Sequence, residues 1–166
     1  MLNVLRQENK KQIGLAMRVI AKAPYGAKAS HKLFPSEVIN LHWSIFDEKG
    51  SVFYSTNNQI DIKKIKAIKK IFLFANSKDE RFLCSADIES IERRDEYWIP
   101  NDALDFLPQE WKYEKKKCWI KLRNFEQIDI DKCNYKVLNQ DILLKGKILE
   151  KRFTTCYVDI FNNTTM

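Results

Sequence analysis

The sequence predicts an α+β domain built on a curved mixed β-sheet with flanking helices. Runs of β-branched and aromatic residues typical of strands recur from residue 51 onward. Segments with helical spacing stand between some of these runs, without the regular strand–helix alternation of a parallel sheet. The 166 residues, 45% of them hydrophobic, are enough to bury one sizeable core. We therefore expect a single domain over residues 1–166.

The first forty residues are predicted to form a helical N-terminal extension. Apolar residues recur among lysines and arginines over residues 1–23 with approximately helical spacing, interrupted at Gly14. Residues 24–26, Pro-Tyr-Gly, end this pattern and begin a short basic connector, which we interpret as a solvated loop. Ser36 follows a proline and precedes a glutamate, which suits a short helical turn.

The next segments predict a hairpin and then a helix. LHWSIF (residues 41–46) and SVFYST (residues 51–56) flank the polar connection DEKG and are expected to pair as strands. In IDIKKIKAIKK (residues 60–70), Ile62, Ile65 and Ile68 fall on one stripe with lysines opposite. This pattern predicts an amphipathic helix of about three turns with a solvated lysine face.

The centre of the sheet is predicted between residues 71 and 91. Residues 71–75 form an unbroken apolar run, a polar turn follows, and apolar residues resume from Phe82 to Ile91. Cys84 falls inside the second strand, where a reduced cysteine acts as a small hydrophobic residue.

The second half of the chain is predicted to contain a long loop and further strands. Residues 93–111 form the loop, with one helical turn expected over residues 101–107. CWIKLRNFEQIDI (residues 118–130) is expected to be a strand because of its aromatic and isoleucine content. Residues 142–161 supply a final strand or two, with Gly146 at a bulge or turn.

The charge balance favours a polyanionic partner. The chain has 29 Lys and Arg against 22 Asp and Glu, which gives a net charge of +7. Surface lysines are, however, more often solvated than functional. No apolar segment marks secretion or membrane insertion, so an intracellular location, cytoplasmic or nuclear, and no membrane partner are expected.

The residues offer little support for catalysis. The four cysteines contain no CxxC pair, and His31 and His42 are not at metal-ligand spacing. There is no G-x-S-x-G, no P-loop and no G-x-G-x-x-G, and no paired carboxylates stand out. We therefore expect a protein that is not an enzyme and that needs neither a metal nor a cofactor.

Recognition of an exposed nucleobase requires residue types that this chain does contain. Aromatic faces stack on a base, polar groups bind its edge, and lysines hold phosphates. We predict Phe53 and Trp98 as walls of a base pocket, with Ser55, Thr56 and Asn57 at the base edge. For Trp43 and Trp119, core packing is the better interpretation. The residues predicted to contact the nucleic-acid backbone are Arg93, Arg94, Lys112, Lys115, Lys116, Lys117 and Lys121.

The order KGSVFYST, a helix, IFLFANSKDERFLCSADIESI, YWIP and CWIKL with FEQID resembles the YTH domain, a member of the PUA-like superfamily that also includes EVE domains. The similarity covers Gly50 to Asp129. It implies a PUA-like curved sheet or open barrel that recognises a modified base in an aromatic cage. Members of this superfamily bind 6-methyladenine in RNA, or serve as DNA-recognition modules of modification-dependent restriction systems with fused or associated effector domains.

The resemblance also assigns residues to the cage. The first cage tryptophan of the family corresponds to Phe53 or Tyr54, the adjoining serine to Ser55, and the second cage tryptophan to Trp98. The third wall would come from the loop before the basic strand. The candidates for that wall are Trp111, Leu104 and Leu107, and those for reading the adenine are Asn40, His42 and Asn57.

Three functions follow from these observations. The leading hypothesis is a YTH/EVE-like module that flips a methylated base into an aromatic pocket. The second is a general basic nucleic-acid binder, DNA or RNA, without base specificity. The third is a protein-interaction domain whose exposed aromatic residues contact a partner.

Overall fold

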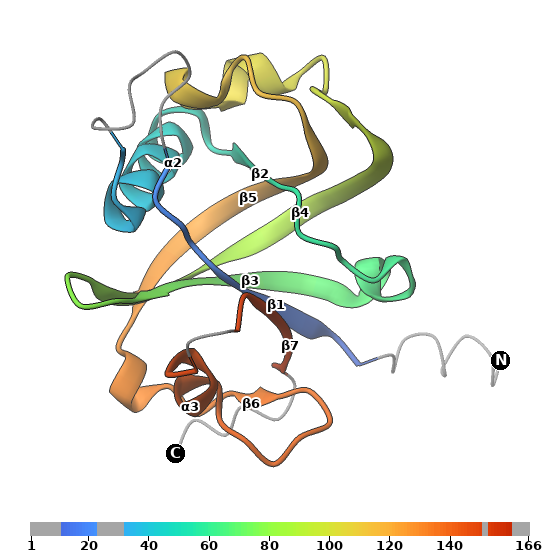
Figure 1. Ribbon diagram of the computed structural model, residues 1–166. Coiled ribbons are helices and arrows are strands. Elements are labelled where there is room, and N and C mark those ends of the chain that lie inside the picture. Colours follow the sequence, from blue (N-terminus) through green and yellow to red (C-terminus); the bar gives the residue numbers. More distant parts are fainter. Residues whose placement is uncertain (1–10, 23–31, 151–152, 161–166) are drawn as a thin grey trace, which may run out of the picture.

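The protein is an α+β domain on one curled sheet of seven strands, in the order β2-β5-β4-β3-β1-β7-β6, that does not close into a barrel (Figure 1). The computed structural model describes residues 11–22, 32–150 and 153–160. The strands are β1 (Ile13–Arg18), β2 (Val52–Thr56), β3 (Ile68–Asn76), β4 (Arg81–Trp98), β5 (Lys116–Ile128), β6 (Lys136–Val137) and β7 (Thr155–Asp159). The helices are α2 (Pro35–Lys49) and α3 (Leu144–Ile148), with short 3-10 helices η2 (Ile62–Ala67), η3 (Ala103–Phe106), η4 (Gln109–Trp111) and η5 (Ile130–Lys132).

The centre of the sheet lies where the apolar runs predicted it. Strands β3 and β4 pair antiparallel from Lys70–Asp87 to Asn76–Arg81, and β4 pairs antiparallel with β5. The sheet is mixed because β1 runs parallel to β3 and antiparallel to β7. The predicted strands over residues 71–75 and 82–91 are therefore confirmed, as is the strand SVFYST. The strand predicted over residues 118–130 is confirmed as far as Ile128, because η5 begins at Ile130.

The predicted N-terminal helix is wrong where the structure describes it, because residues 13–18 form β1 in the interior of the sheet. A strand covered on both faces is an almost continuous apolar run, which hydrophobic periodicity alone does not separate from a buried helix. Gly14 fits this position, since a Cβ there would lie 2.7 Å from the ring of Phe72. The helix predicted over residues 1–10 and the connector over residues 23–31 lie outside the described residues.

The predicted hairpin between LHWSIF and SVFYST is also wrong, because residues 41–46 belong to helix α2. The helix begins at Pro35, and the Glu37 carboxylate accepts the Phe34 main-chain N–H at 3.0 Å. It ends at Gly50, whose φ of 85° is left-handed and whose N–H donates to the Phe46 carbonyl at 2.7 Å. Val38, Ile39 and His42 are its buried residues, so the helical stripe includes a histidine that interrupts the apolar pattern.

Three further boundaries differ from the prediction. The lysine-rich segment forms only the 3-10 helix η2, and Ile68 already begins β3. Strand β4 continues to Trp98, so the predicted loop starts later, although η3 confirms a helical turn within it. Gly146 lies in helix α3 rather than at a bulge, while β7 confirms a final strand.

The sheet is curled strongly enough to bring its distant strands together. The Asn58 side-chain nitrogen, just after β2, donates to the Thr155 hydroxyl of β7 at 3.2 Å. The Asp61 N–H donates to the Tyr157 hydroxyl at 2.8 Å. Because β5, β4, β3 and β1 separate β2 from β7 in the sheet, these contacts require the sheet to fold round on itself.

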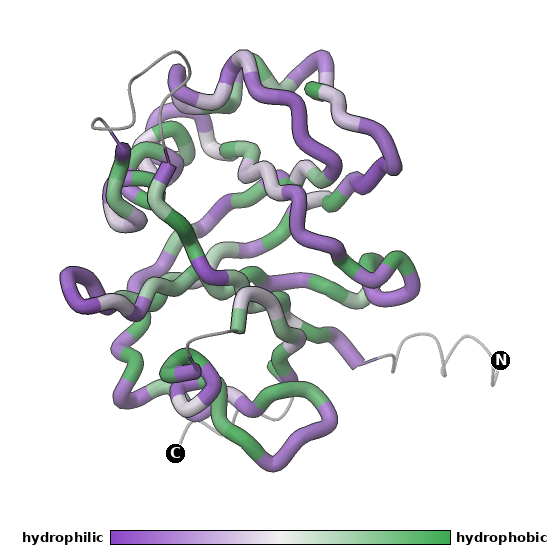
Figure 2. Tube along the Cα trace, viewed as in Figure 1, coloured by the Kyte–Doolittle hydropathy of each residue, from purple (hydrophilic) through white to green (hydrophobic). Residues whose placement is uncertain are grey.

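Alternate residues of the central strands belong to two hydrophobic clusters on opposite faces of the sheet. Leu15 and Leu73 face the larger cluster inside the curl, whereas Phe72 and Phe74 face a smaller one that includes residues of α3. Figure 2 shows the hydrophobic residues along the crossing strands and a hydrophilic turn between β3 and β4. Both faces are therefore covered, which fixes the register of the strands.

Candidate ligand cavity

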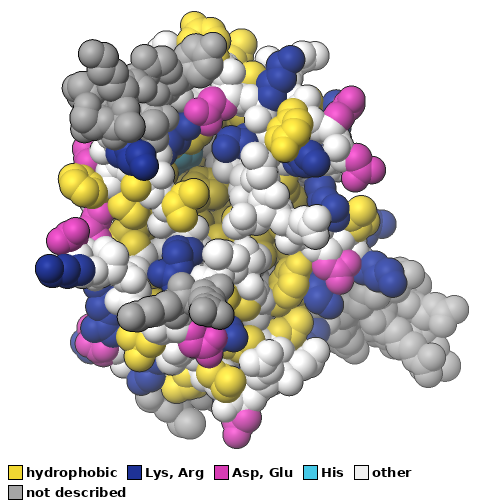
Figure 3. Space-filling model, in the orientation of Figure 1, with side chains coloured by type: hydrophobic (Ala, Val, Ile, Leu, Met, Phe, Trp, Pro, Cys, Tyr) yellow, Lys and Arg dark blue, Asp and Glu magenta, His cyan; other side chains and the backbone are white. Residues whose placement is uncertain are grey.

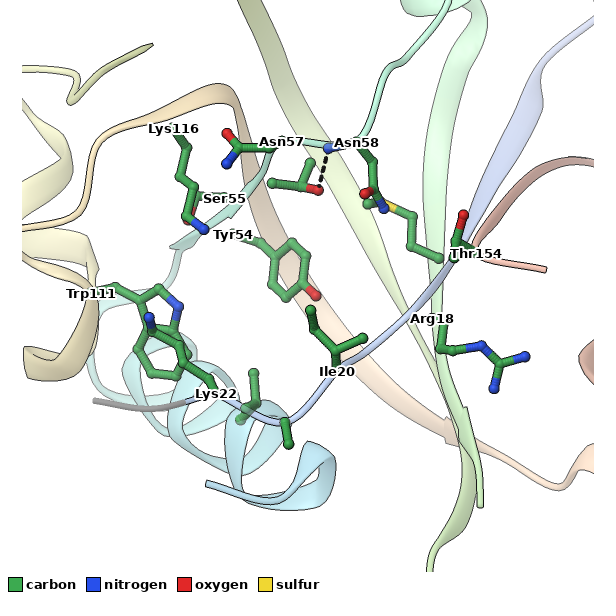
Figure 4. Close-up of a pocket in the computed structure, with 14 residues that line it drawn as sticks. Arg18, Ile20, Lys22, Tyr54, Ser55, Asn57, Asn58, Trp111, Lys116 and Thr154 are labelled. Atoms are coloured by element: carbon green, nitrogen blue, oxygen red, sulfur yellow. Dashed lines mark hydrogen bonds between the residues drawn. The ribbon is translucent and has the colours of Figure 1, made fainter. Parts of the chain in front are cut away.

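A cavity of about 390 Å³ opens between the end of β1 and strand β2 (Figure 4). These strands are not neighbours in the sheet, so the cavity exists only because the sheet curls. Helix α2, η4 and the start of β5 complete its wall. The lining residues are Met17, Arg18, Ile20, Ala21, Lys22, Val38, Tyr54, Ser55, Thr56, Asn57, Asn58, Trp111, Lys116 and Thr154.

Two aromatic rings, those of Tyr54 and Trp111, line the cavity and share the ring of His42 as a common neighbour. The His42 ring centroid lies 5.2 Å from that of Tyr54 and 4.5 Å from that of Trp111, the latter edge to face. His42 itself is fully buried and is not among the residues lining the cavity. It therefore supports the two rings from behind and does not reach a ligand.

Burial keeps His42 neutral. It lowers the pKa of His42 from 6.5 to about 4, partly opposed by the contact of 2.7 Å between Nδ1 and the Val38 carbonyl oxygen. With Nδ1 as the donor, Nε2 is an acceptor, and it is buried without a hydrogen-bond partner among the described residues. A neutral imidazole in this position adds no charge beneath the two aromatic rings.

Tyr54 presents a protonated hydroxyl to the cavity. Burial raises the pKa of Tyr54, so the phenol keeps its proton and can donate a hydrogen bond. Figure 4 shows the hydroxyl pointing across the cavity toward Ile20. The arrangement supplies one neutral donor at the edge of an aromatic face.

The polar segment after Tyr54 is partly held by internal hydrogen bonds. The Thr56 hydroxyl accepts the Asn58 N–H at 2.9 Å, and the Asn57 side-chain oxygen accepts the Lys117 N–H at 3.1 Å. Ser55 lies opposite Trp119 in the β2–β5 ladder, on the strand face away from Tyr54, and its hydroxyl is buried without a partner among the described residues. The three predicted edge residues thus all line the cavity, but the Ser55 side chain belongs to the other face of β2.

Positive charge at the cavity comes from two lysines joined by one carboxylate. Lys22 forms an ion pair with Glu114 Oε1, and Lys116 Nζ lies 3.8 Å from Glu114 Oε2. The Lys22 ammonium also lies 5.4 Å from the centroid of the Trp111 ring. The third cationic residue of the wall, Arg18, is committed to the fold, because its guanidinium donates to the carbonyls of Phe153 and Glu150.

Phe53 and Trp98 do not form the predicted pair of walls, and that prediction is wrong. Phe53 packs edge to face on Trp119, with ring centroids 6.2 Å apart. Trp98 packs on the same Trp119, at 6.5 Å, and is covered by the Arg94 guanidinium at 4.5 Å. Neither ring lines the cavity. Because side chains alternate along β2, Phe53 and Tyr54 point to opposite faces.

Only one of the other predicted wall residues lines the cavity. Trp111 lines the cavity, whereas Leu107 is buried in the core and Leu104 is exposed on η3, and neither leucine lines it. Among the candidates for reading a base, Asn57 lines the cavity, but Asn40 is exposed elsewhere on α2.

Most of the predicted backbone-contacting residues lie away from the cavity, along β4 and β5. Lys116 alone among them lines it. Arg93 is fixed by a hydrogen bond to the Ile60 carbonyl at 2.7 Å, and Lys121 lies over Phe106 and close to Glu89. The remaining predicted residues are Arg94 over Trp98, Lys117 over Tyr97, and Lys112 and Lys115 in the segment before β5. On the face shown in Figure 3, Lys and Arg side chains are scattered and do not form one continuous patch.

The prediction missed the residues that β1 and its continuation bring to the cavity. These include Met17, Ile20 and Lys22, which fall in a segment predicted as a helix. Val38 and Thr154 were also missed, because they come from helix α2 and from the residue just before β7, which only the folded sheet brings to the cavity. No local signal marks them; only the alternation of Leu15 and Met17 hints at a strand.

The described residues show neither a metal site nor an activated thiol. No three His, Cys, Asp or Glu residues come together as potential metal ligands in residues 11–22, 32–150 and 153–160. Burial raises the pKa of Cys84, Cys118 and Cys156 to about 12, so these groups stay protonated. Within the same part of the chain, no helix combines the length and apolar character needed to cross a membrane.

Comparison of the chain with protein-family models, with curated proteins and with solved structures gave no match.

Proposed function

We propose that this protein is a nucleic-acid-binding module that takes a single flipped base, methylated in the manner of 6-methyladenine, into the cavity between Tyr54 and Trp111. The observation that supports this function is the meeting of two aromatic residues, a polar strand end and two lysines around one cavity. These are the residue types that stacking, edge recognition and phosphate contact require. The proposal keeps the aromatic base pocket expected from the sequence, but its walls are Tyr54 and Trp111 and not Phe53 and Trp98.

The size and lining of the cavity suit a flat, largely apolar group. Its volume of about 390 Å³ falls within the range of about 300–1,000 Å³ typical of small-molecule sites. Stacking of a base on an aromatic side chain contributes about 1–3 kcal/mol. Val38 and Met17 supply apolar wall against which a methyl group can be buried.

The curled sheet that brings β1 and β2 together is also the architecture expected from the YTH/EVE resemblance. Under this proposal the chain is a PUA-like domain whose ligand enters where the sheet stays open. An effector domain or partner protein would then act on the nucleic acid that the module holds. The module itself is proposed to carry no catalytic activity.

The test compares oligonucleotides that differ by one methyl group. A single-stranded oligonucleotide with one 6-methyladenine should bind more tightly than its unmodified counterpart in calorimetry, and Trp111→Leu should remove most of the difference. Trp43→Leu is the control, because Trp43 undergoes the same change of side chain but stacks on Phe125, with ring centroids 5.5 Å apart, outside the cavity. Trp43 is partly buried, whereas Trp111 is 5% exposed. Equal affinity for both oligonucleotides in the wild-type protein contradicts the proposal.

A second candidate, general nucleic-acid binding without base specificity, is favoured by the outer side of β4 and β5. There Tyr97 is 56% exposed beneath the Lys117 ammonium, which lies 4.9 Å from the ring centroid. Such an aromatic–lysine pair can stack a base of any kind and contact its phosphate. This candidate predicts a steep salt dependence, no preference for methylation, and loss of affinity in Tyr97→Ala but not in Trp111→Leu.

A further inference from the structure

The carboxylate of Glu114 joins the two lysines of the cavity. One oxygen pairs with Lys22, which is 92 residues away in sequence, and the other lies 3.8 Å from the Lys116 ammonium. The side chains of Lys22, Glu114 and Lys116 are only 15%, 21% and 26% exposed. Solvent therefore screens this group less than it screens an ordinary surface ion pair.

Both lysines line the cavity, whereas Glu114 does not. The ammonium of Lys22 also lies over the Trp111 ring, so a base that stacks on Trp111 displaces this ammonium and brings its own phosphate within reach of the lysine side chain. Two ammonium groups facing one phosphate form a recognition site for an anion. The Glu114 carboxylate is an anion that already pairs with both ammonium groups.

We infer that Lys22 and Lys116 form the phosphate subsite of the cavity. Glu114 is the counter-ion of these two lysines, and it competes with the ligand phosphate, which displaces it on binding. This inference rests on the proposed nucleic-acid function for the identity of the ligand. Glu114 then determines the affinity for nucleic acid, although an acidic side chain is not expected to contact a phosphate. The carboxylate keeps the two lysines in place while the cavity is empty.

Removing the charge of Glu114 should therefore strengthen phosphate binding. Glu114→Gln leaves both ammonium groups free for the ligand, and we expect affinity for a short single-stranded oligonucleotide containing one 6-methyladenine to rise about threefold to tenfold at low salt. The salt dependence of binding should become steeper, since the ligand then forms more charge contacts. Fluorescence anisotropy at two salt concentrations measures both effects.

The control is Glu126→Gln, which makes the same change of net charge at an exposed position of β5. A general charge effect would raise affinity equally in both variants. The inference requires a larger gain in Glu114→Gln than in Glu126→Gln, and it requires Lys116→Met to abolish that gain in the Glu114→Gln background. Equal gains, or weaker binding in Glu114→Gln, overturn it.

A ligand without a base separates this inference from the proposed function. Inorganic pyrophosphate, measured by calorimetry, should also bind Glu114→Gln more tightly than wild type, and Trp43→Leu, which changes a ring outside the cavity, should leave this binding unchanged. If pyrophosphate behaves in this way while methylated and unmodified oligonucleotides bind equally, the phosphate subsite stands and base recognition fails. If methylation is recognised but pyrophosphate binding does not respond to Glu114→Gln, the subsite fails alone.

Discussion

The indole Nε1 of Trp119 donates a hydrogen bond to the main-chain carbonyl of Trp98 at 2.9 Å, and the two rings pack edge to face. This contact fixes the end of the long strand β4 against β5, where the ladder is interrupted between Arg93 and Trp98. It also explains why Trp98 is a structural residue: its ring is held between Trp119 and the Arg94 guanidinium. Trp98 and Trp119 thus stabilise the fold on the face of β2 opposite Tyr54.

Trp119→Phe should destabilise the protein by about 2–3 kcal/mol, because it removes this hydrogen bond and leaves a gap at a site that is 1% exposed. Urea denaturation measures the loss. Trp43→Phe should cost less, since Trp43 is only partly buried and a phenylalanine can still stack on Phe125. Equal losses in the two variants would show that the hydrogen bond and full burial of Trp119 contribute nothing extra.

Gly50→Ala should cost about 1–2 kcal/mol of stability, because the residue that ends α2 has a φ of 85°. No atom lies within 4 Å of a Cβ built there, so the cost is one of backbone conformation and not of packing. Gly146→Ala is the matched control: its Cβ is equally free, but its backbone is helical. That variant should gain up to about 1 kcal/mol in the same denaturation experiment. A loss in both variants would contradict this account.

Gly14→Ala tests the close approach of β1 to β3. The added Cβ would lie 2.7 Å from one ring carbon of Phe72 and 3.1 Å from a methyl carbon of Ile160. Phe72 is fully buried and cannot move freely, so we expect a loss of about 1–3 kcal/mol. In a double-mutant cycle, Gly14→Ala should cost less stability in the Phe72→Leu background than in the wild type, because the smaller side chain leaves room for the Cβ. Additive effects would exclude this contact as the cause.

The buried His42 should make the protein less stable in mild acid. Its pKa is lowered to about 4 in the folded protein, against 6.5 for an ordinary histidine. Well above pH 6.5 the group is neutral in both states and contributes nothing. As the pH falls from 6.5 toward 4, the unfolded chain gains a proton that the folded protein does not, so stability decreases. The decrease attributable to this group approaches about 3 kcal/mol.

His42→Gln removes this titration while keeping a neutral polar side chain. Between pH 7.5 and pH 4.5, wild type should lose about 2 kcal/mol more than the variant, measured by urea denaturation at each pH. Other titrating groups are common to both proteins and cancel in the difference. Parallel pH profiles for the two proteins would show that His42 does not titrate between the folded and unfolded states.

The strands at the centre of the sheet could be predicted because burial on both faces requires almost every residue to be apolar, as in residues 71–75. The same rule misled at β1, where Leu15, Ala16 and Met17 follow a glycine and precede an arginine in a pattern equally compatible with a helix. Helix α2 was missed because its buried stripe includes His42 and because its aromatic residues Trp43 and Phe46 favour strands. In that helix, tertiary packing outweighed local propensity.

The sequence by itself determined that an aromatic residue and a polar strand end occur together near residues 53–57, with lysines and Trp111 following further along the chain. Only the tertiary structure decided which of them meet. Side chains alternate along a strand, so whether Phe53 or Tyr54 faces the cavity depends on which face of β2 the rest of the molecule covers. The curl that places Lys22 beside Glu114 arises from the accumulated twist of several strands, a property that no single segment contains.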